Sequence, residues 1–273
     1  SCLEQDYSNI ELVIADDGST DGTHEMLEEY SNLYPGKFIL KLSKSNQGIT
    51  INSNAAHFAC SGKYIAWMGG DDLMLPSKLS RQVSFMEDNE DCSICYHDLD
   101  VFESITNRTL YYFSDKNKPL EGDASVVIKY GTFNGACSTM VRRSCTPDKG
   151  FEKTIPLASD WLYWVETLIS SGEIRYIPEV LGRYRRHNDN VTKKDVTKIG
   201  QNTIDHLNSC NYIMSHYPIF FKEATYRYSM NIRSIRKQLP YMSSLWYVTK
   251  VSIDMKSMLS ILVYILPFRK IKL

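Results

Sequence analysis

The sequence predicts an α/β fold in which a mostly parallel sheet is flanked by helices. Apolar strand-like runs alternate with helical patterns, and that alternation is typical of βα units. Two of the runs end in paired aspartates, at the sheet edge where ligands of α/β folds usually bind. The strand-like runs are residues 10–15, 38–42, 64–68, 92–96 and 137–142, and the helical patterns are residues 22–34, 49–59, 77–89 and 122–130.

Length and composition divide the chain into two parts. The 273 residues suffice for one α/β domain, which we place at 1–194, and for a C-terminal helical extension at 195–273. The extension is rich in tyrosine and basic residues. Within the first part, residues 99–120 are polar and irregular, apart from a strand-like run at 109–113.

The most informative feature is the pair Asp71 and Asp72, which follows Gly69 and Gly70 at the end of the run 64–68. Adjacent carboxylates repel each other, and a hard divalent cation takes one or two carboxylates together with phosphate oxygens. The pattern therefore predicts a site for a metal-bound diphosphate. The alternative is a solvated acidic turn before a helix that has Pro76 in its first turn.

A second acidic pair, Asp16 and Asp17, follows the apolar run 10–15. It precedes a helix whose apolar positions fall on one face, namely Met26, Tyr30 and Leu33. Such a loop can present either aspartate to a ribose hydroxyl or a base edge, while the helix N-terminus favours anions. A capped surface turn would explain Ser19 to Asp21 but not the paired carboxylates.

These runs resemble the inverting family 2 nucleotide-sugar glycosyltransferases with the GT-A fold, over roughly residues 1 to 192. The matching stretches are Val13 to Thr23, Asn46-Gln47-Gly48, Gly62 to Ala66, Gly70-Asp71-Asp72 with Pro76 and Lys78-Leu79, Ala158 to Trp161, and Ile177 to His187. The resemblance implies a nucleotide-binding part at about 1–98 and an acceptor part at about 99–194. It also implies that Asp16, Asp17, Ser19, Asn46, Gly48 and Asp71 contact the sugar nucleotide, and that Mg²⁺ or Mn²⁺ is held near Asp72.

The chain departs from the family at three places, one of which is Ser53, where relatives often have a basic residue before the Asn of the helix that follows Asn46-Gln47-Gly48. It opens at Ser1 to Gln5, which resembles the end of a helix that follows the family's first strand, and it has no initiator Met. We therefore expect a fragment whose sheet lacks a central member. Gly69 stands where many relatives have an aspartate, so metal binding must depend on Asp71 and Asp72, as in a Gly-Asp-Asp subgroup.

The base must be a separate group, because a metal does not deprotonate the acceptor hydroxyl. Asp160 is the candidate. It follows Ser159, a plausible N-cap, and precedes the helically spaced apolar residues Leu162, Val165, Leu168 and Ile169. A helix N-terminus tends to keep a carboxylate ionised. The alternative is a first-turn aspartate that only favours the helix dipole.

Arg185, Arg186 and His187 end a strand-like run that begins at Ile174. Arginine offers paired donors to phosphate oxygens, and a neutral imidazole can complete a metal site with Asp71 and Asp72. The match to the family's Tyr-Arg-x-His ending favours a loop that closes over the donor or the metal. The alternative is an exposed basic segment.

The predicted function is metal-dependent, inverting, hexosyltransferase-like transfer of a sugar from a nucleoside diphosphate, with UDP preferred, to a hydroxyl of a glycan or lipid-linked glycan. Bacterial surface-polysaccharide synthesis is the expected setting. A sugar nucleotidyltransferase would need a glycine-rich Arg-Lys loop, and a nicotinamide oxidoreductase a Gly-x-Gly-x-x-Gly turn; neither is present. A non-catalytic sugar-nucleotide or glycan binding module stays open.

Charge and cysteine content constrain partners and location. The formal net charge is −1, so nothing suggests nucleic-acid binding. The seven cysteines are an odd number scattered through apolar segments, which is typical of reduced thiols in a cytoplasmic protein. Cys92 and Cys95 have redox or zinc spacing, but with no second pair we interpret them as structural.

The C-terminal segment Met258–Leu273 is apolar for about a dozen residues before Pro267. That is shorter than the ~20 residues a membrane-spanning helix needs. Basic flanks at Lys256, Arg269, Lys270 and Lys272 suit an anionic membrane surface, so we expect peripheral contact with the inner face of the plasma membrane. The alternative is a helix packed on the catalytic domain or on the second subunit of a homodimer.

Overall fold

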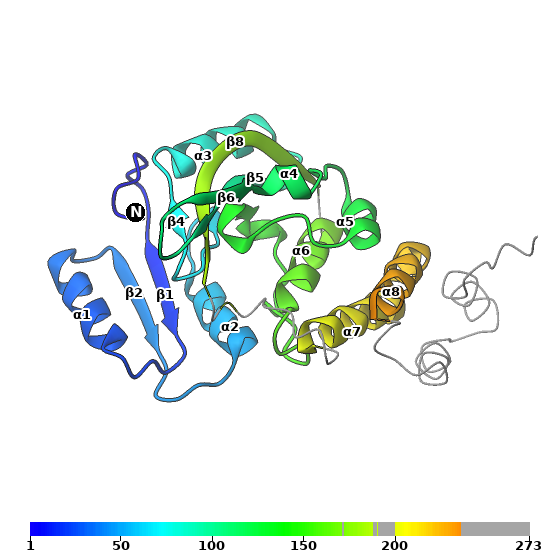
Figure 1. Ribbon diagram of the computed structural model, residues 1–273, viewed down its shortest axis with the longest axis horizontal. Coiled ribbons are helices and arrows are strands. Elements are labelled where there is room, and N and C mark those ends of the chain that lie inside the picture. Colours follow the sequence, from blue (N-terminus) through cyan, green and yellow to red (C-terminus); the bar gives the residue numbers. More distant parts are fainter. Residues whose placement is uncertain (171, 188–189, 191–199, 236–273) are drawn as a thin grey trace, which may run out of the picture. The chain divides into compact units, whose positions relative to one another are not determined.

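The computed structural model describes residues 1–170, 172–187, 190 and 200–235. Contacts divide the chain into two compact units. The first comprises residues 1–127 and 132–191, and the second comprises 128–131 with the chain from 192 onward. The first unit combines strands and helices (Figure 1), which confirms the predicted α/β class.

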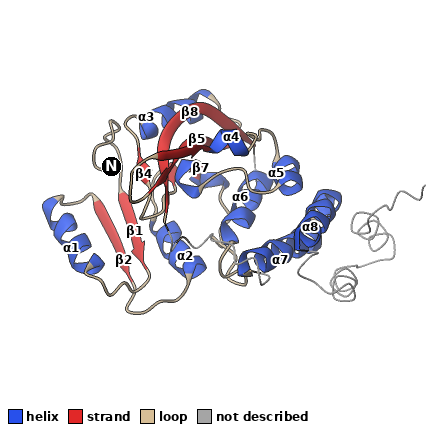
Figure 2. Ribbon diagram, viewed as in Figure 1, coloured by secondary structure: helices blue, strands red, loops and turns tan. Residues whose placement is uncertain are grey.

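The strands of the first unit form two sheets in the described part of the chain (Figure 2). The smaller one pairs β1 (Leu12–Asp16) with β2 (Phe38–Leu42). The larger one has the order β3-β7-β5-β8-β4, with β6 paired to β5. Its strands are β3 (Tyr64–Ala66), β4 (Leu73–Met74), β5 (Cys92–Glu103), β6 (Thr109–Tyr112), β7 (Thr139–Arg142) and β8 (Glu173–Arg186).

The larger sheet is mixed, whereas the sequence predicted mostly parallel pairing. β5 and β8 run parallel, but β3–β7, β4–β8, β5–β6 and β5–β7 are antiparallel. The short connection between β5 and β6 explains part of the difference, because a parallel crossover needs a dozen or more residues. The long parallel pair with β8 is consistent with the burial of β5, in which Ile94, Leu99 and Val101 are each fully buried.

Helices of the first unit match the predicted patterns closely. They are α1 (Thr23–Leu33), α2 (Ile49–Ala59), α3 (Lys78–Asp88), the short α4 (Phe113–Lys116), α5 (Ala124–Tyr130), which continues into the second unit, and α6 (Ser159–Ser170). Leu162, Val165 and Leu168 are buried as expected from α6, and Ile169 is partly exposed.

The apolar face predicted for α1 exists but does not pack against a core. Met26, Tyr30 and Leu33 are 48%, 42% and 63% exposed, and Leu27 is the buried residue of the helix. Periodicity therefore identified the helix, while the described parts of the chain leave that face exposed.

The core of the larger sheet joins α3 to the strands beside it. It contains Met74, Leu79, Met86, Cys92, Cys95, Met140, Ile177 and Leu181. Each fully buried side chain of this size contributes about 1.5–3 kcal/mol through removal from water. All seven cysteines are free thiols, and Cys92 and Cys95 are buried in β5, which supports their structural interpretation.

The second unit contains α7 (Gln201–His216), the turn η3 (Pro218–Phe220) and α8 (Phe221–Ile235). Apolar side chains are buried on both helices, including Leu207 and Ile213 on α7 and Tyr228 on α8. In the described part of the chain, none of the helices combines the length and apolar character needed to cross a membrane. The segment Met258–Leu273, for which membrane contact was predicted, lies outside the described residues.

Candidate active site

The turn between β3 and β4 holds Asp71 and Asp72, and β8 fixes it in place. Asp72 is buried, at 6% exposure. Its Oδ1 accepts the backbone N–H of Arg185 at 2.9 Å. The Arg185 Nε donates to the Asp71 carbonyl at 2.6 Å. Arg185 therefore holds this turn through both its backbone and its guanidinium.

Gly69 explains how the two carboxylates come together. A Cβ at Gly69 would lie 2.9 Å from Asp71 Oδ1 and 3.2 Å from Asp72 Oδ2, so both oxygens face the space where this residue has no side chain. A side chain at position 69 would require these two carboxylates to shift. Burial, followed by the neighbouring Asp71 charge, raises the pKa of Asp72 to about 6 despite the opposing bond from Arg185. Two converging acidic groups suit a divalent cation.

His187 lies beside this turn. Its Nε2 is 3.0 Å from Asp71 Oδ2, and its backbone N–H donates to Asn190 at 2.7 Å. Among the residues described, however, no group of three or more His, Cys, Asp or Glu side chains is arranged around one metal position. The two carboxylates would therefore hold Mg²⁺ or Mn²⁺ together with phosphate oxygens of a ligand, rather than as part of a site made of protein side chains alone.

The two predicted phosphate-binding arginines differ in their contacts. The Arg185 guanidinium packs over the Phe102 ring, 4.7 Å from its centroid, in addition to its bond to Asp71. The Arg186 guanidinium lies 5.1 Å from the centroid of Tyr184. Arg185 thus organises the acidic turn, a role that the sequence did not predict.

The loop after β1 gathers the other predicted nucleotide-binding residues. Asp17 accepts the backbone N–H groups of Gln47 and Gly48, each at 2.8 Å. Asp16 accepts the Ser19 hydroxyl at 2.6 Å and lies 2.6 Å from His24 Nε2. The region is tightly packed, because a Cβ at Gly18 would lie 2.9 Å from the backbone nitrogen of Asn46. The loop after β1 and the loop before α2 therefore pack together, and they bring together Asp16, Asp17, Ser19, Asn46 and Gly48.

Asp160 stands in the first turn of α6. Its Oδ1 accepts the backbone N–H of Trp161 at 2.8 Å, and burial raises its pKa. The sequence predicted that the helix N-terminus would keep Asp160 ionised. In the structure, the effect of burial on the pKa of Asp160 is larger than that of the Trp161 hydrogen bond, and it opposes ionisation. The predicted N-cap is wrong: α6 begins at Ser159 itself, whose hydroxyl lies 2.7 Å from that of Thr50. A raised pKa makes Asp160 a stronger base near neutral pH.

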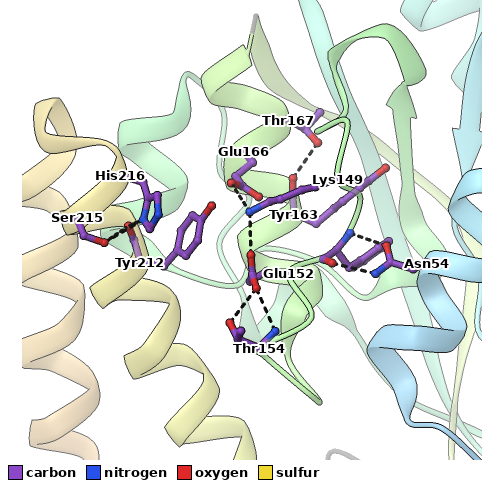
Figure 3. Close-up of polar contacts among 11 residues, drawn as sticks. Asn54, Lys149, Glu152, Thr154, Tyr163, Glu166, Thr167, Tyr212, Ser215 and His216 are labelled. Atoms are coloured by element: carbon purple, nitrogen blue, oxygen red, sulfur yellow. Dashed lines mark hydrogen bonds and ion pairs between the residues drawn. The ribbon is translucent and has the colours of Figure 1, made fainter.

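The loop before α6 is held from two sides (Figure 3). Asn54 of α2 exchanges two hydrogen bonds with the Phe151 backbone, at 2.9 and 2.8 Å. Lys149 bridges Glu152 at 3.1 Å and the buried Glu166 of α6 at 3.0 Å. Gly150, with φ of +68°, is required here because a Cβ would lie 2.3 Å from the Asn54 side-chain oxygen. These contacts fix the chain that leads to Asp160.

One helical turn joins the candidate base to the loop after β1. Gly48, which precedes α2, donates to Asp17, and Thr50 in the first turn of α2 contacts Ser159. Trp67, directly after β3, packs edge-on against Tyr163 of α6, with ring centroids 5.8 Å apart. The two acidic loops and the start of α6 thus belong to one contiguous part of the first unit.

One contributor escaped sequence reasoning. Thr50 of α2 holds the start of α6 through its contact with Ser159. It has no local signal, because the two residues are 109 positions apart in the chain.

A mixed α/β unit with acidic loops at strand ends is the arrangement that the sequence predicted for a nucleotide-sugar transferase. The chain belongs to Glycosyl transferase family 2, whose profile matches residues 1–145. It is 31% identical to an uncharacterised protein of Mycobacterium tuberculosis over 180 residues, 65% of this chain and 50% of that protein. It is 30% identical to an uncharacterised glycosyltransferase of Nostoc sp. over 197 residues, 70% of this chain and 60% of that protein.

Solved structures share the fold. S. aureus TarS 1-349 in complex with UDP superposes with a TM-score of 0.65 at 12% identity, over 95% of this chain and 74% of that one. The mannosyltransferase PcManGT from Pyrobaculum calidifontis, in complex with GDP-Man and Mn²⁺, gives a TM-score of 0.54 at 14% identity, over 97% and 79%. The predicted GT-A fold is confirmed. The chain spans about half to three fifths of the length of the curated relatives named above.

Proposed function

We propose that this chain is a metal-dependent, inverting glycosyltransferase. It moves a sugar from a nucleoside diphosphate, UDP in the first instance, to a hydroxyl of a glycan or lipid-linked glycan. The observation that carries the proposal is the convergence of Asp71 Oδ1 and Asp72 Oδ2 over Gly69, in the same unit as a half-buried, more basic Asp160.

Asp160 is proposed to accept the proton of the acceptor hydroxyl as that oxygen attacks the anomeric carbon. Attack from the face opposite the leaving nucleotide inverts the configuration. The raised pKa of Asp160 favours this step, since a base works best when its pKa approaches the working pH. The contacts of Ser159 with Thr50 and of Lys149 with Glu166 hold the start of α6 steady during the step.

Asp72 and Asp71, with His187 beside them, are proposed to hold Mg²⁺ or Mn²⁺. When bound, the cation would offset the negative charge of the diphosphate leaving group. Arg185 keeps the two carboxylates in place through its backbone N–H and its Nε. Ser19, Asn46 and Gly48 are assigned to the nucleoside side, on the loops that Asp16 and Asp17 organise.

The structures that share this fold support a nucleotide donor, because their ligands are UDP, UDP-GlcNAc and GDP-Man with Mn²⁺. We place the catalytic domain at 1–194 and assign the acceptor side to about 99–194. From the sequence of 195–273 we further propose a cytoplasmic enzyme that contacts the inner face of the membrane, where lipid-linked acceptors of surface polysaccharide synthesis reside.

The test is Asp160→Asn, compared with wild type and with Asp88→Asn, an exposed position at the end of α3. Sugar release from UDP-sugars is measured with Mn²⁺ and an acceptor, and binding of UDP with Mn²⁺ is measured by thermal shift. We expect turnover to fall by about 10²- to 10⁴-fold in Asp160→Asn with nucleotide binding retained. Near wild-type turnover would refute the role of Asp160, and no binding of any nucleoside diphosphate would refute the transferase function.

A further inference from the structure

Helix α2 buries polar side chains and exposes apolar ones, the reverse of an ordinary amphipathic helix. Its buried residues, spaced by four and three positions and therefore on one face, are Thr50, Asn54 and His57. Its exposed large apolar residues are Ile49, Ile51 and Phe58. Because a buried polar group is costly without a hydrogen-bond partner, the buried face of α2 depends on specific partners.

Thr50 has its partners directly before Asp160. The Thr50 hydroxyl donates to the Ile155 carbonyl at 2.5 Å. That bond uses its only proton, so in the 2.7 Å contact between the two hydroxyls Ser159 is the donor and Thr50 the acceptor. Thr50 and Ser159 are both buried. One threonine side chain thus fixes two points of the chain within five residues of the candidate base.

The other two residues of this face bind the same stretch of the chain. Asn54 exchanges two hydrogen bonds with the Phe151 backbone, at 2.9 and 2.8 Å. His57 Nδ1 lies 3.2 Å from the hydroxyl of Tyr163, which is on α6. The whole buried face of α2 is therefore hydrogen-bonded to residues 151–163, the stretch that contains Asp160.

The start of α2 is also joined to the loop after β1. Asp17 accepts the backbone N–H of Gly48 at 2.8 Å. The Asn52 side-chain nitrogen donates to the carbonyl of Ala15, in β1, at 3.0 Å. One helix therefore connects, through hydrogen bonds alone, the loop assigned to the nucleoside and the stretch that carries the candidate base.

Hydrogen bonds suit this connection better than apolar contacts would. A satisfied buried polar network specifies one arrangement, because each bond has a preferred direction and length. A base must lie within hydrogen-bond reach of the hydroxyl it deprotonates, and a misplacement of about 1 Å can reduce a rate by about 10²-fold. A polar buried face on α2 is thus expected if the position of Asp160 matters more than the gain from apolar burial.

We propose that Thr50 is a positioning residue for sugar transfer: its hydroxyl, bonded to Ser159 and to the Ile155 carbonyl, sets the place of Asp160 relative to the loop after β1. The inference rests on the proposed function and deepens it, because it assigns part of the transfer rate to a buried side chain that acts only through its neighbours.

The experiment compares wild type with Thr50→Val and with the matched control Thr167→Val, all as the full 273-residue chain. Both substitutions keep the side-chain shape and remove a buried hydroxyl. The Thr167 hydroxyl donates within α6, to the Tyr163 carbonyl at 2.8 Å, on the side away from Asp160 in sequence (Figure 3). Thr50→Ser is the conservative variant, because it retains the hydroxyl.

The donor is whichever of UDP-GlcNAc, UDP-glucose, UDP-galactose and GDP-mannose wild type turns over fastest with Mn²⁺. Its kcat and KM are measured by nucleotide release, binding of the matching nucleoside diphosphate with Mn²⁺ by calorimetry, and Tm by thermal unfolding. We expect Thr50→Val to lower kcat by roughly 10- to 100-fold, with donor KM and nucleotide affinity within about twofold of wild type.

Thr50→Ser should restore kcat to within about threefold of wild type. Thr167→Val should lower Tm by about 2–8 °C, as Thr50→Val does, because each loses buried hydrogen bonding. Its kcat should nevertheless stay within about twofold of wild type. Equal kcat values for the two valine variants would mean that Thr50 is only structural, and that result would overturn the proposal.

Ser159→Ala is the second variant, because it keeps the bond from Thr50 to Ile155 and removes only the hydroxyl beside Asp160. It should lower kcat severalfold with nucleotide binding retained, and an unchanged kcat would overturn the proposal even if Thr50→Val does not fold. If wild type turns over no sugar nucleotide, the proposed function fails and this inference fails with it. Wild-type turnover that Thr50→Val retains in full overturns this inference alone.

Discussion

Two aspartate pairs at strand ends have opposite environments in this fold. Asp16 and Asp17 accept hydrogen bonds from loop donors: Asp17 from the backbone N–H groups of Gln47 and Gly48, in the loop before α2, at 2.8 Å, and Asp16 from Ser19 at 2.6 Å. Asp71 and Asp72 instead direct oxygens toward the same space over Gly69. The same dipeptide thus organises a loop in one place and concentrates negative charge in the other.

The pKa shifts follow from this difference. Burial alone would raise the pKa of Asp16, but hydrogen bonds from Ser19 and His24 together outweigh it and lower the pKa. Burial and the charge of Asp71 raise the pKa of Asp72 to about 6, and the bond from Arg185 offsets only part of that effect. The number of nearby donors, rather than residue type, therefore decides which pair is available to a cation.

Asp72→Asn should have the largest effect. We expect kcat/KM for the donor to fall by roughly 100-fold or more, because one of the two converging carboxylates is lost. The measurement is Mn²⁺-dependent nucleotide release, with Asp88→Asn as the control. A loss in kcat/KM smaller than threefold would contradict the contrast between the two aspartate pairs, since Asp71 and Asp72 would then have no more function than a surface turn.

The stability of Asp72→Asn should depend on pH with a defined sign. The native pKa of about 6 exceeds the ordinary value of 3.8, so between these values the native chain keeps a proton that the unfolded chain releases. Ionisation of Asp72 therefore lowers the free energy of unfolding progressively as pH rises from about 4 to 6. Above pH 6 the loss stays constant. Asp72→Asn should match wild type near pH 4 and exceed it by roughly 2–3 kcal/mol at pH 7.

Urea unfolding at several pH values, without divalent cations, measures this difference. A constant gap between the two proteins from pH 4 to pH 7 would contradict the raised pKa. Added Mn²⁺ should narrow the gap at pH 7 if the wild-type carboxylate pair binds the cation, because binding to the native state adds stability.

Asp17→Ala tests the structural side of the comparison. It leaves the N–H groups of Gln47 and Gly48 without their acceptor at the start of α2, so we expect a loss of about 1–2 kcal/mol in unfolding free energy. Asp17→Asn, which retains one acceptor oxygen, should lose less. Unchanged stability with a large loss of UDP affinity would show that Asp17 is chiefly a nucleotide ligand.

Asp71→Asn should have the smallest effect. The Asp71 side chain is 43% exposed, and its contact with His187 is of the surface type that contributes about 0–1 kcal/mol. We expect a change below about 0.5 kcal/mol in stability and an increase of roughly threefold in donor KM. Thermal unfolding and nucleotide release measure the two quantities. A larger effect than that of Asp72→Asn would reverse the assigned order of the two carboxylates.

Local patterns were sufficient for most elements of the fold. The predicted strand at residues 38–42 and the predicted helix at 49–59 coincide with β2 and α2, and both acidic pairs lie at strand ends as expected. These features depend on side-chain period, glycine positions and turn residues, which lie within a few positions of one another. The α/β class and the positions of the candidate acids follow from them.

Only the tertiary structure decided how those segments act on one another. The Arg185 backbone reaches Asp72 from 113 residues away, α1 leaves its apolar face exposed, and the larger sheet pairs mostly antiparallel strands. A sequence pattern records the period of a segment but not the neighbours it meets, and those neighbours set burial, hydrogen-bond donors and therefore the charge of each acid.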